Sequence, residues 1–332
     1  MAKPFHLPPG IGPAENLPCQ FPVSSFPQAC FISAPALVSL QTSGGAKHRL
    51  LRRKSDREIH SSPQGPIMTE STSPTPLSQG KILPPEQIEH FRQKGYLAIG
   101  KLLDDDLIGQ LRAEYDTVFE RARNAGDFRN LALDDSDDLE AKNQAPEQML
   151  QIMQMCERSI HFRRLLYDER ILDIVEDLIG TDIQLFHDQA LYKPAHCGGP
   201  VFWHQDNAYW QCSPATLVSC WLTLDDVDVA NGAMHLIPGS HLQALDHERS
   251  ATTGALLDIG SQIDSTRAVA IDLPAGGLLV HHCQTLHYTP PNKTARQRRA
   301  FVIHCMEPGT RRSRNGQNID VSFANPMLRL RL

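Results

Sequence analysis

The sequence lacks the marks of a membrane protein and of a nucleic-acid-binding protein. No apolar run approaches the roughly 20 residues that a membrane-spanning helix requires. The longest candidate, ACFISAPALVSL at 29–40, is short and is interrupted by Pro35. The net charge is −6, without the basic excess that a phosphate backbone attracts. We therefore expect neither a membrane span nor a nucleic-acid partner.

Paired cysteines and a secretory leader are also missing. The eight cysteines are scattered without a Cys-x-x-Cys pair, which disfavours a structural zinc knuckle. Met1 is followed by a Pro-rich stretch instead of a basic start and an apolar core, so no leader is expected. These two features favour a reducing compartment, the cytoplasm.

The first 81 residues differ in composition from the rest. They hold about half of the 24 prolines and Ser/Thr clusters such as STSPTPLSQG, without a sustained helical or strand period. Such a segment cannot bury enough apolar surface to offset its chain entropy, which predicts a disordered extension over 1–81. Two alternatives stay open. The basic KHRLLRRK would suit a mitochondrial or other organellar transit peptide, and Met68 could be the true initiator.

Helical patterns open the remaining segment, 82–332, which we expect to form one domain. LPPEQIEHFRQKGYLAI, which begins at Leu83, predicts a Pro-marked helix followed by a short strand. Residues 104–123 carry apolar side chains at steps of four behind an acidic start, as in an amphipathic helix. Another helix is predicted within 169–182, ended by Gly180. The acidic LDDSDDLE between them, at 133–140, is expected to be a solvated loop.

After residue 182 the pattern becomes β-rich. Short apolar runs rich in β-branched and aromatic residues are separated by turns rich in Pro, Gly and Asn, as in a β-sandwich or barrel. The predicted fold class is therefore mainly β with flanking helices, in which an N-terminal helical layer precedes the β-rich half.

Two potential metal ligands lie within an aromatic run of this half. FWHQDNAYW, at 202–210, contains His204 and Asp206 one residue apart. Residues i and i+2 of a strand point to the same face, so a strand here would aim both side chains together. About one His-x-Asp pair is expected by chance in a chain of this composition, so the pair taken alone favours an ordinary solvated strand face.

The downstream sequence supplies a third ligand and a cation. His287 ends an apolar strand and precedes the turn TPPNKT, and Arg298 opens the last apolar strand eleven residues later. Two histidines and one carboxylate make a facial triad, which leaves three positions of an octahedral Fe(II) open. Arginine has the rigid fork that binds a carboxylate through two hydrogen bonds.

Three stretches carry a family resemblance. HQDNAYW, WLTLDDVDVANGAMHLIPGSH and LHYTPPNKTARQRRA resemble, in order, the phytanoyl-CoA dioxygenase family of Fe(II)/2-oxoglutarate oxygenases, over about 85–306. The resemblance implies a double-stranded β-helix, that is, a cupin-like jelly roll. It implies Fe(II) ligation by His204, Asp206 and His287, with 2-oxoglutarate and O₂ as co-substrates. For 2-oxoglutarate it implies the binding residues Arg298, Thr289, Trp221 and Gln189.

Most other histidines and arginines of this half are expected to have ordinary roles. At most one of His281 and His282 faces inward, because they alternate along a strand. His187, His235 and His304 are expected to be core or pocket residues. Alternation separates Arg298 from Arg299, and we expect Arg296 and Arg299 to face solvent.

The resemblance also implies a reaction. It is hydroxylation of an aliphatic C–H bond in a small-molecule metabolite or acyl substrate, with release of succinate and CO₂. Relatives that halogenate replace the carboxylate ligand, and Asp206 is present. Desaturation, cyclisation or epimerisation would use the same ligands, and a non-catalytic jelly-roll binding protein is the rival from another class. The oligomeric state is left open.

Overall fold

The computed structural model describes residues 82–131, 147–249, 256–259, 263–314, 317–321 and 324–330. Segment 1–81 and the acidic run at 133–140 therefore lie outside the described residues. Within the described ranges, no helix is long and apolar enough to cross a membrane.

The helices α1, α2 and α6 lie where the sequence predicts helices, whereas α4, α5 and α7 were not predicted. Pro85 occupies the first turn of α1, and Gly95 ends it in the left-handed conformation with φ of 81°. Asp104 caps α2 by accepting a hydrogen bond from the Leu107 amide. The α-helices are α1 Pro85–Lys94, α2 Asp105–Ala125, α4 Met155–Arg158, α5 Ile160–Leu165, α6 Glu169–Ile179 and α7 Asp206–Trp210. Short 3₁₀ helices are η1 Val229–Asn231, η2 Ser240–Leu242 and η3 Ser265–Arg267.

A large antiparallel sheet forms the centre of the fold. Its strand order is β1-β12-β7-β14-β4-β3-β2, and β17 also pairs with β4. The strands are β1 Tyr96–Lys101, β12 Gly277–His282, β7 Val218–Thr223, β14 Arg298–Met306, β4 Ile183–Lys193, β3 Leu150–Met153, β2 Arg129–Asn130 and β17 Met327–Arg329. The longest strands, β4 and β14, lie side by side in the middle of this sheet.

A second antiparallel sheet has the order β11-β8-β13-β5. Its strands are β11 Val269–Ile271, β8 Met234–Leu236, β13 His287–Thr289 and β5 Val201–His204. The remaining strands form two small sheets, one of β16 Gln317–Asp320, β15 Arg311–Arg314 and β6 Cys212–Ser213, and one of β9 Glu248–Arg249 and β10 Leu257–Asp258.

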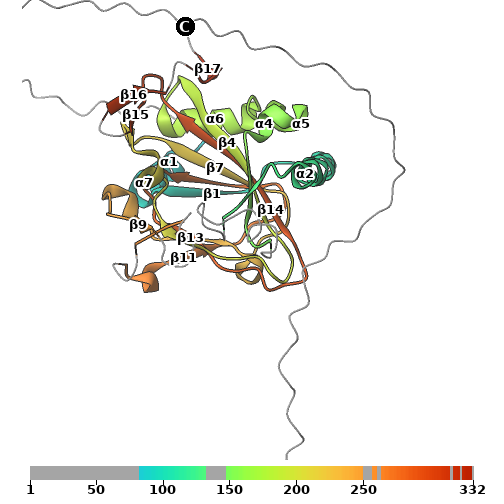
Figure 1. The fold of residues 1–332 in the computed structure, drawn as a ribbon. Coiled ribbons are helices and arrows are strands. Elements are labelled where there is room, and N and C mark those ends of the chain that lie inside the picture. Colours follow the sequence, from blue (N-terminus) through green and yellow to red (C-terminus); the bar gives the residue numbers. More distant parts are fainter. Residues whose placement is uncertain are drawn as a thin grey trace, which may run out of the picture. The chain divides into compact units, whose positions relative to one another are not determined.

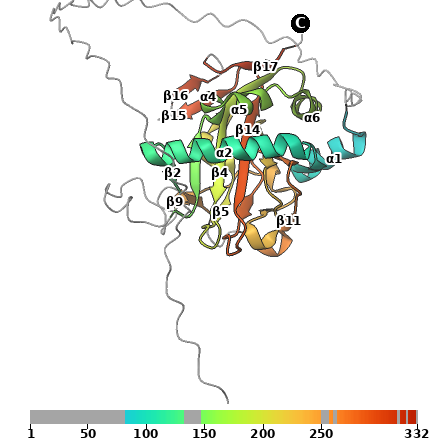
Figure 2. The same cartoon turned by 90° about the vertical axis from the view of Figure 1, so that its right-hand side faces the viewer.

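The two larger sheets pack face to face, and helices cover the outer side of the large one. Figure 1 shows α2, α5 and α6 on one side of β4, β7 and β14, with β11 and β13 on the other. Figure 2 shows α2 crossing in front of β4 and β14. Trp221 and Val302 of the large sheet pack against Met234 and Ile271 of the small one. The helical layer and the β-rich half therefore form the predicted arrangement.

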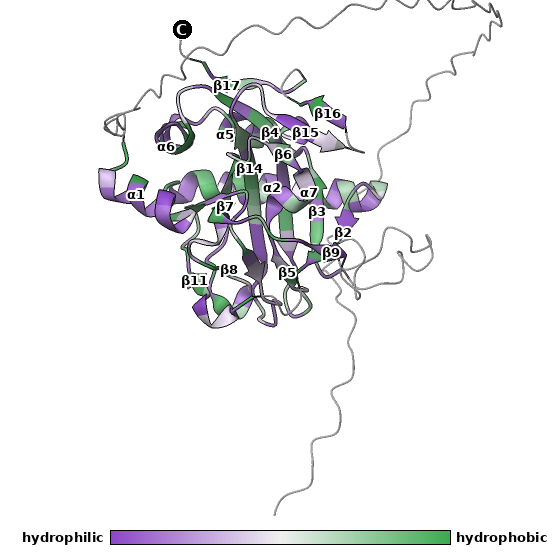
Figure 3. Cartoon of the chain, turned by 90° about the vertical axis from the view of Figure 1, so that its left-hand side faces the viewer, coloured by the Kyte–Doolittle hydropathy of each residue, from purple (hydrophilic) through white to green (hydrophobic). Residues whose placement is uncertain are grey.

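Alternation along the central strands separates two environments. In β14, Phe301 and Ile303 join the core beneath the helices, whereas Ala300 and Val302 face the small sheet. Figure 3 shows that the ribbon of α1 alternates between hydrophilic and hydrophobic segments, as expected of an amphipathic helix. Side chains of β14 that face the space between the two sheets therefore occupy even-numbered positions.

Candidate metal and co-substrate site

The three predicted ligands come from three neighbouring elements. His204 is the last residue of β5 and is paired with His287, the first residue of β13. Asp206 is not on a strand, because β5 ends at His204 and Asp206 begins α7. The prediction that both residues of the His-x-Asp pair project from one strand face is therefore wrong. They converge because the chain turns into a helix after the extended residue Gln205.

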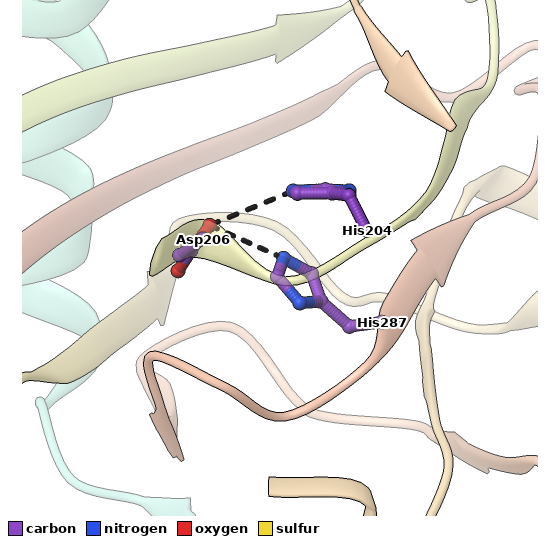
Figure 4. A group of neighbouring side chains, drawn as sticks. All are labelled: His204, Asp206 and His287. Carbon is purple, nitrogen blue, oxygen red and sulfur yellow. Dashed lines mark ion pairs between the residues drawn. The ribbon is translucent and has the colours of Figure 1, made fainter. Parts of the chain in front are cut away.

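One oxygen of Asp206 faces both imidazoles. Asp206 Oδ1 lies 3.5 Å from His204 Nε2 and 3.6 Å from His287 Nε2. Figure 4 shows the three side chains pointing toward one another from their separate segments. Three possible ligand atoms, one from each residue, all lie within 4.8 Å of one another. This spacing is suitable for one metal ion that contacts two nitrogens and one oxygen.

The other nitrogen of each histidine is occupied. His204 Nδ1 lies 2.7 Å from the Phe202 carbonyl oxygen, and His287 Nδ1 lies 2.9 Å from the Thr285 carbonyl oxygen. A carbonyl only accepts, so each Nδ1 carries a hydrogen, and in the neutral ring the lone pair is then on Nε2. Backbone bonds of this kind orient metal-binding histidines and fix their tautomers.

Burial and neighbouring imidazoles determine the charges of the site. Burial favours a neutral Asp206, but the neighbouring His287, His204 and His281 outweigh it and hold the pKa of this carboxyl well below its usual value. Burial, followed by the nearby His204, lowers the pKa of His287 well below its usual value, although Asp206 opposes this shift. At neutral pH the carboxylate is ionised and His287 is neutral, which is the state that binds a metal.

The triad lies in the wall of a cavity of about 450 Å³ between the two sheets. All seven predicted site residues line this cavity, namely His204, Asp206, His287, Arg298, Thr289, Trp221 and Gln189. Apolar side chains form much of the remaining wall, among them Leu131, Met149, Met153, Val201 and Leu256. Tyr209 and Trp210 of the aromatic run also line it, whereas Phe202 and Trp203 pack in apolar clusters.

Arg298 is a buried cation that forms no ion pair with any of the described residues. Its side chain is among the largest that are fully buried, and none of its three guanidinium nitrogens has a hydrogen-bond partner in the described ranges. Burial lowers its pKa to about 10, so it is still charged at neutral pH. Trp221 packs beside it, with the guanidinium carbon 5.6 Å from the ring centroid. The hydroxyl of Thr289 is also buried and has no hydrogen-bond partner in the part of the chain that the structure describes. These unsatisfied donors fit the carboxylate of a bound organic anion.

Sequence reasoning missed residues behind the triad. Ser219 of β7 donates a hydrogen bond to Asp206 Oδ2 at 2.9 Å, and His304 Nδ1 lies 2.8 Å from the Ser219 hydroxyl. His304 also contacts Gln189, with 2.9 Å between the two Nε2 atoms. Alternation could have found them, because Ser219 shares a face with Trp221 and His304 shares one with Arg298.

Two other predictions concern neighbouring positions. His281 is buried and lines the cavity, with Nδ1 3.9 Å from Asp206 Oδ2, so it is the inward-facing member of the His281–His282 pair. Arg296 is half exposed and pairs with Asp228. Arg299, however, is only 7% exposed, so the prediction that it faces solvent is wrong. It binds Asp225 and Asp116 on the helix-covered side of the sheet.

Comparisons with known proteins agree with this arrangement. The sequence profile of the phytanoyl-CoA dioxygenase family matches residues 91–300. A probable alpha-ketoglutarate-dependent hypophosphite dioxygenase from Stutzerimonas stutzeri is 31% identical over 145 residues, which cover 42% of this chain and 50% of that protein. A phytanoyl-CoA dioxygenase from Arabidopsis thaliana is 22% identical over 254 residues, which cover 68% of this chain and 89% of that protein.

The fold has close counterparts among solved structures. The crystal structure of EvdO2 from Micromonospora carbonacea var. aurantiaca, complexed with 2-oxoglutarate, superposes with a TM-score of 0.56 at 25% identity. The superposition covers 72% of this chain and 96% of that chain. The predicted jelly roll is confirmed. The chain belongs to the phytanoyl-CoA dioxygenase family and is a non-haem iron, 2-oxoglutarate-dependent dioxygenase.

Proposed function

We propose that the protein hydroxylates an aliphatic C–H bond of a small-molecule metabolite or acyl substrate and that 2-oxoglutarate is converted to succinate and CO₂ in the same turnover. The observation that carries this proposal is the unpaired, buried Arg298 in the cavity that also contains the triad. A buried cation without a partner is costly, and a bound carboxylate removes that cost.

The residues present fit Fe(II). The donor set is two imidazole nitrogens and one carboxylate oxygen, all buried and convergent. We propose His204, Asp206 and His287 as the three ligands, which leaves three positions for a bidentate co-substrate and O₂. Bound Fe(II) supplies the activation of O₂ that couples decarboxylation of the co-substrate to oxidation of a C–H bond.

The protein's own part is positioning. We propose that Arg298 binds the far carboxylate of 2-oxoglutarate through its fork and that Thr289 donates its free hydroxyl to the same group. Trp221 then supports the guanidinium from its face, where its ring already lies. Holding the far carboxylate of 2-oxoglutarate fixes the position of its other end relative to the triad. This orientation lowers the entropic part of the reaction barrier.

The cavity wall supports a substrate with an aliphatic body. Leu131, Met149, Val201 and Leu256 line it, and these side chains exclude water and favour a hydrocarbon surface. The carboxylate at position 206 favours hydroxylation over halogenation. Desaturation, cyclisation or epimerisation remains the alternative outcome at the same site, since each needs the same ligands. The complete triad and the buried Arg298 disfavour the alternative of a non-catalytic binding protein.

An anaerobic titration tests the proposal. Fe(II) is added to the metal-free protein with 2-oxoglutarate, and the weak visible charge-transfer band of the ternary complex is recorded. We expect this band, followed by substrate-dependent succinate release in a screen of aliphatic acids, amino-acid derivatives and acyl thioesters. Absence of the band at saturating Fe(II) and 2-oxoglutarate would contradict the proposed ligands and the proposed co-substrate site together.

We also propose that 82–332 constitutes the oxygenase domain. The family profile begins at residue 91, and α1 begins at Pro85, which supports a boundary near 82. The cytoplasmic location stays a prediction and is tested by imaging the tagged full chain in cells.

A further inference from the structure

A continuous line of hydrogen bonds ends at the carboxylate ligand. Ser219 contacts Asp206 Oδ2, His304 contacts Ser219, and Gln189 contacts His304. The side-chain amide of Gln151 in β3 donates in turn to Gln189 Oε1. Ser219 and His304 are almost fully buried, and His304, Gln189 and Gln151 line the cavity. The line therefore connects the cavity wall to a proposed metal ligand through four strands of the large sheet, β3, β4, β14 and β7.

The direction of every bond in this line follows from chemistry. An ionised carboxylate only accepts, so the single hydrogen of Ser219 points to Asp206. The hydroxyl oxygen must then accept from His304 Nδ1, which makes His304 Nε2 an acceptor when the ring is neutral. Gln189 Nε2 donates to that nitrogen, and its carbonyl accepts from Gln151. Burial is the main cause that holds the pKa of His304 well below its usual value, so the ring is neutral at pH 7.

Because of the hydrogen bond from Ser219, the two oxygens of Asp206 have different neighbours. Oδ1 faces His204 and His287, and Oδ2 faces Ser219. A carboxylate that turned to present both oxygens to a metal would have to break the Ser219 bond. It would also fill one of the three positions that a bidentate co-substrate and O₂ need. The hydrogen bond therefore stabilises the arrangement in which only one oxygen is available to the metal.

We propose that Ser219 and His304 are positioning residues that hold Asp206 as a one-oxygen metal ligand, and that Gln189 and Gln151 link this ligand to the substrate cavity. The inference rests on the proposed function of the triad. It gives Gln189 a role in addition to the predicted co-substrate binding, because its amide oxygen accepts from Gln151 and its amide nitrogen contacts His304. A substrate that displaces Gln151 would change the bonds behind Asp206 without touching the metal.

Co(II) binding to the metal-free protein tests the proposal without turnover. We expect Ser219→Ala to weaken Co(II) binding by about 10-fold or more, because in metalloproteins the loss of a hydrogen bond to a metal-binding side chain has an effect of this size. Thr223→Val is the matched control. Thr223 lies on the same strand, is equally buried and donates its hydroxyl to the Pro274 carbonyl, away from the site. We expect it to bind Co(II) like the parent protein.

A pair of substitutions at His304 separates hydrogen bonding from packing. His304→Phe keeps the ring volume and removes the donor, so we expect a loss like that of Ser219→Ala. His304→Asn places an amide nitrogen near the position of Nδ1, and we expect it to restore most of the Co(II) affinity. Equal Co(II) affinities for His304→Phe and His304→Asn would overturn the proposal. This comparison does not require Ser219→Ala, so it is decisive even if that variant does not fold.

Asp206→Ala distinguishes this inference from the function on which it rests. Loss of Co(II) binding in Asp206→Ala, together with unchanged binding in Ser219→Ala and His304→Phe, would overturn only the positioning line. Unchanged binding in all three variants would remove the metal site itself. Visible absorption of bound Co(II) supplies a second readout, because a change in the number of Asp206 oxygens at the metal shifts its d–d bands.

Discussion

Arg298 and Arg299 are adjacent in β14, yet their guanidinium groups face opposite sides of the large sheet. Arg298 lines the cavity and has no hydrogen-bond partner among the described residues, whereas Arg299 binds Asp225 through two bonds and Asp116 through a third. Arg299 is paired with carboxylates of the protein, and Arg298 is the residue that we propose binds the co-substrate. The pair therefore offers a test of function and a control for stability within one strand.

Arg298→Lys should weaken binding of 2-oxoglutarate far more than binding of the metal. Lysine keeps the positive charge but loses the planar fork, and the second charge-assisted bond contributes about 1–3 kcal/mol, or roughly 10- to 100-fold in affinity. Calorimetric titration of the Co(II)-loaded protein with 2-oxoglutarate measures this effect. Unchanged affinity would mean that the far carboxylate is bound elsewhere.

Arg298→Met should stabilise the ligand-free protein while abolishing co-substrate binding. The native state buries an uncompensated charge, and replacing buried ionic groups with apolar side chains of similar volume is often neutral or stabilising by about 1–4 kcal/mol. Urea unfolding without ligand, compared with the parent, measures the change. A clear loss of stability would indicate that Arg298 has a structural anion partner and is not waiting for a ligand.

Asp225→Asn should lower the stability of the protein and leave co-substrate binding unchanged, the opposite of Arg298→Met. It removes the anion that Arg299 binds through two hydrogen bonds beneath α2, and breaking a buried pair costs on the order of 3 kcal/mol. We expect a lower free energy of unfolding and unchanged Co(II) and 2-oxoglutarate affinities at a temperature where the variant is folded. A selective loss of 2-oxoglutarate affinity would show that the two faces of β14 are coupled.

Periodicity and turn residues were sufficient to predict the helices at α1, α2 and α6 and the strands of the β-rich half. They also place Arg298 and Arg299 on opposite faces. They could not predict that Arg299 is buried, because its partners Asp116 and Asp225 are distant in sequence and meet it only in the folded chain. A charged residue at a strand position is buried or exposed according to such partners, which local pattern does not contain.

The site shows the same limit. The His-x-Asp pair was recognised, but its strand geometry was not correct, since α7 begins at Asp206. A helical turn of five residues is too short to have a period that distinguishes it from a strand end. Ser219 and His304 carry no motif at all. Their role depends on β7 and β14 being neighbours in the sheet, which brings the two side chains within 2.8 Å.

A chain that begins at Met68 should behave like the full chain. The family profile and the first described helix both begin after this residue, so the proposed domain is retained. We expect equal melting temperatures and equal 2-oxoglutarate affinities, measured by calorimetry on both proteins. A large loss in either quantity would place part of the oxygenase domain before residue 68. Import into mitochondria that depends on 1–60 would favour the transit-peptide alternative.

Asp206→Ala distinguishes a metal ligand from an ordinary polar residue. Without a metal role, losing this carboxylate relieves a buried charge and leaves turnover intact. As the only anionic ligand of the triad, its loss should weaken Fe(II) binding and lower succinate formation by orders of magnitude, even with Fe(II) in excess. The fold should survive, because the core clusters beneath the helices do not include Asp206. Asp225→Asn is the control, since it removes a carboxylate from the other face. Wild-type succinate formation by folded Asp206→Ala would refute the metal site, whereas a new chloride-dependent halogenation would support it by another route.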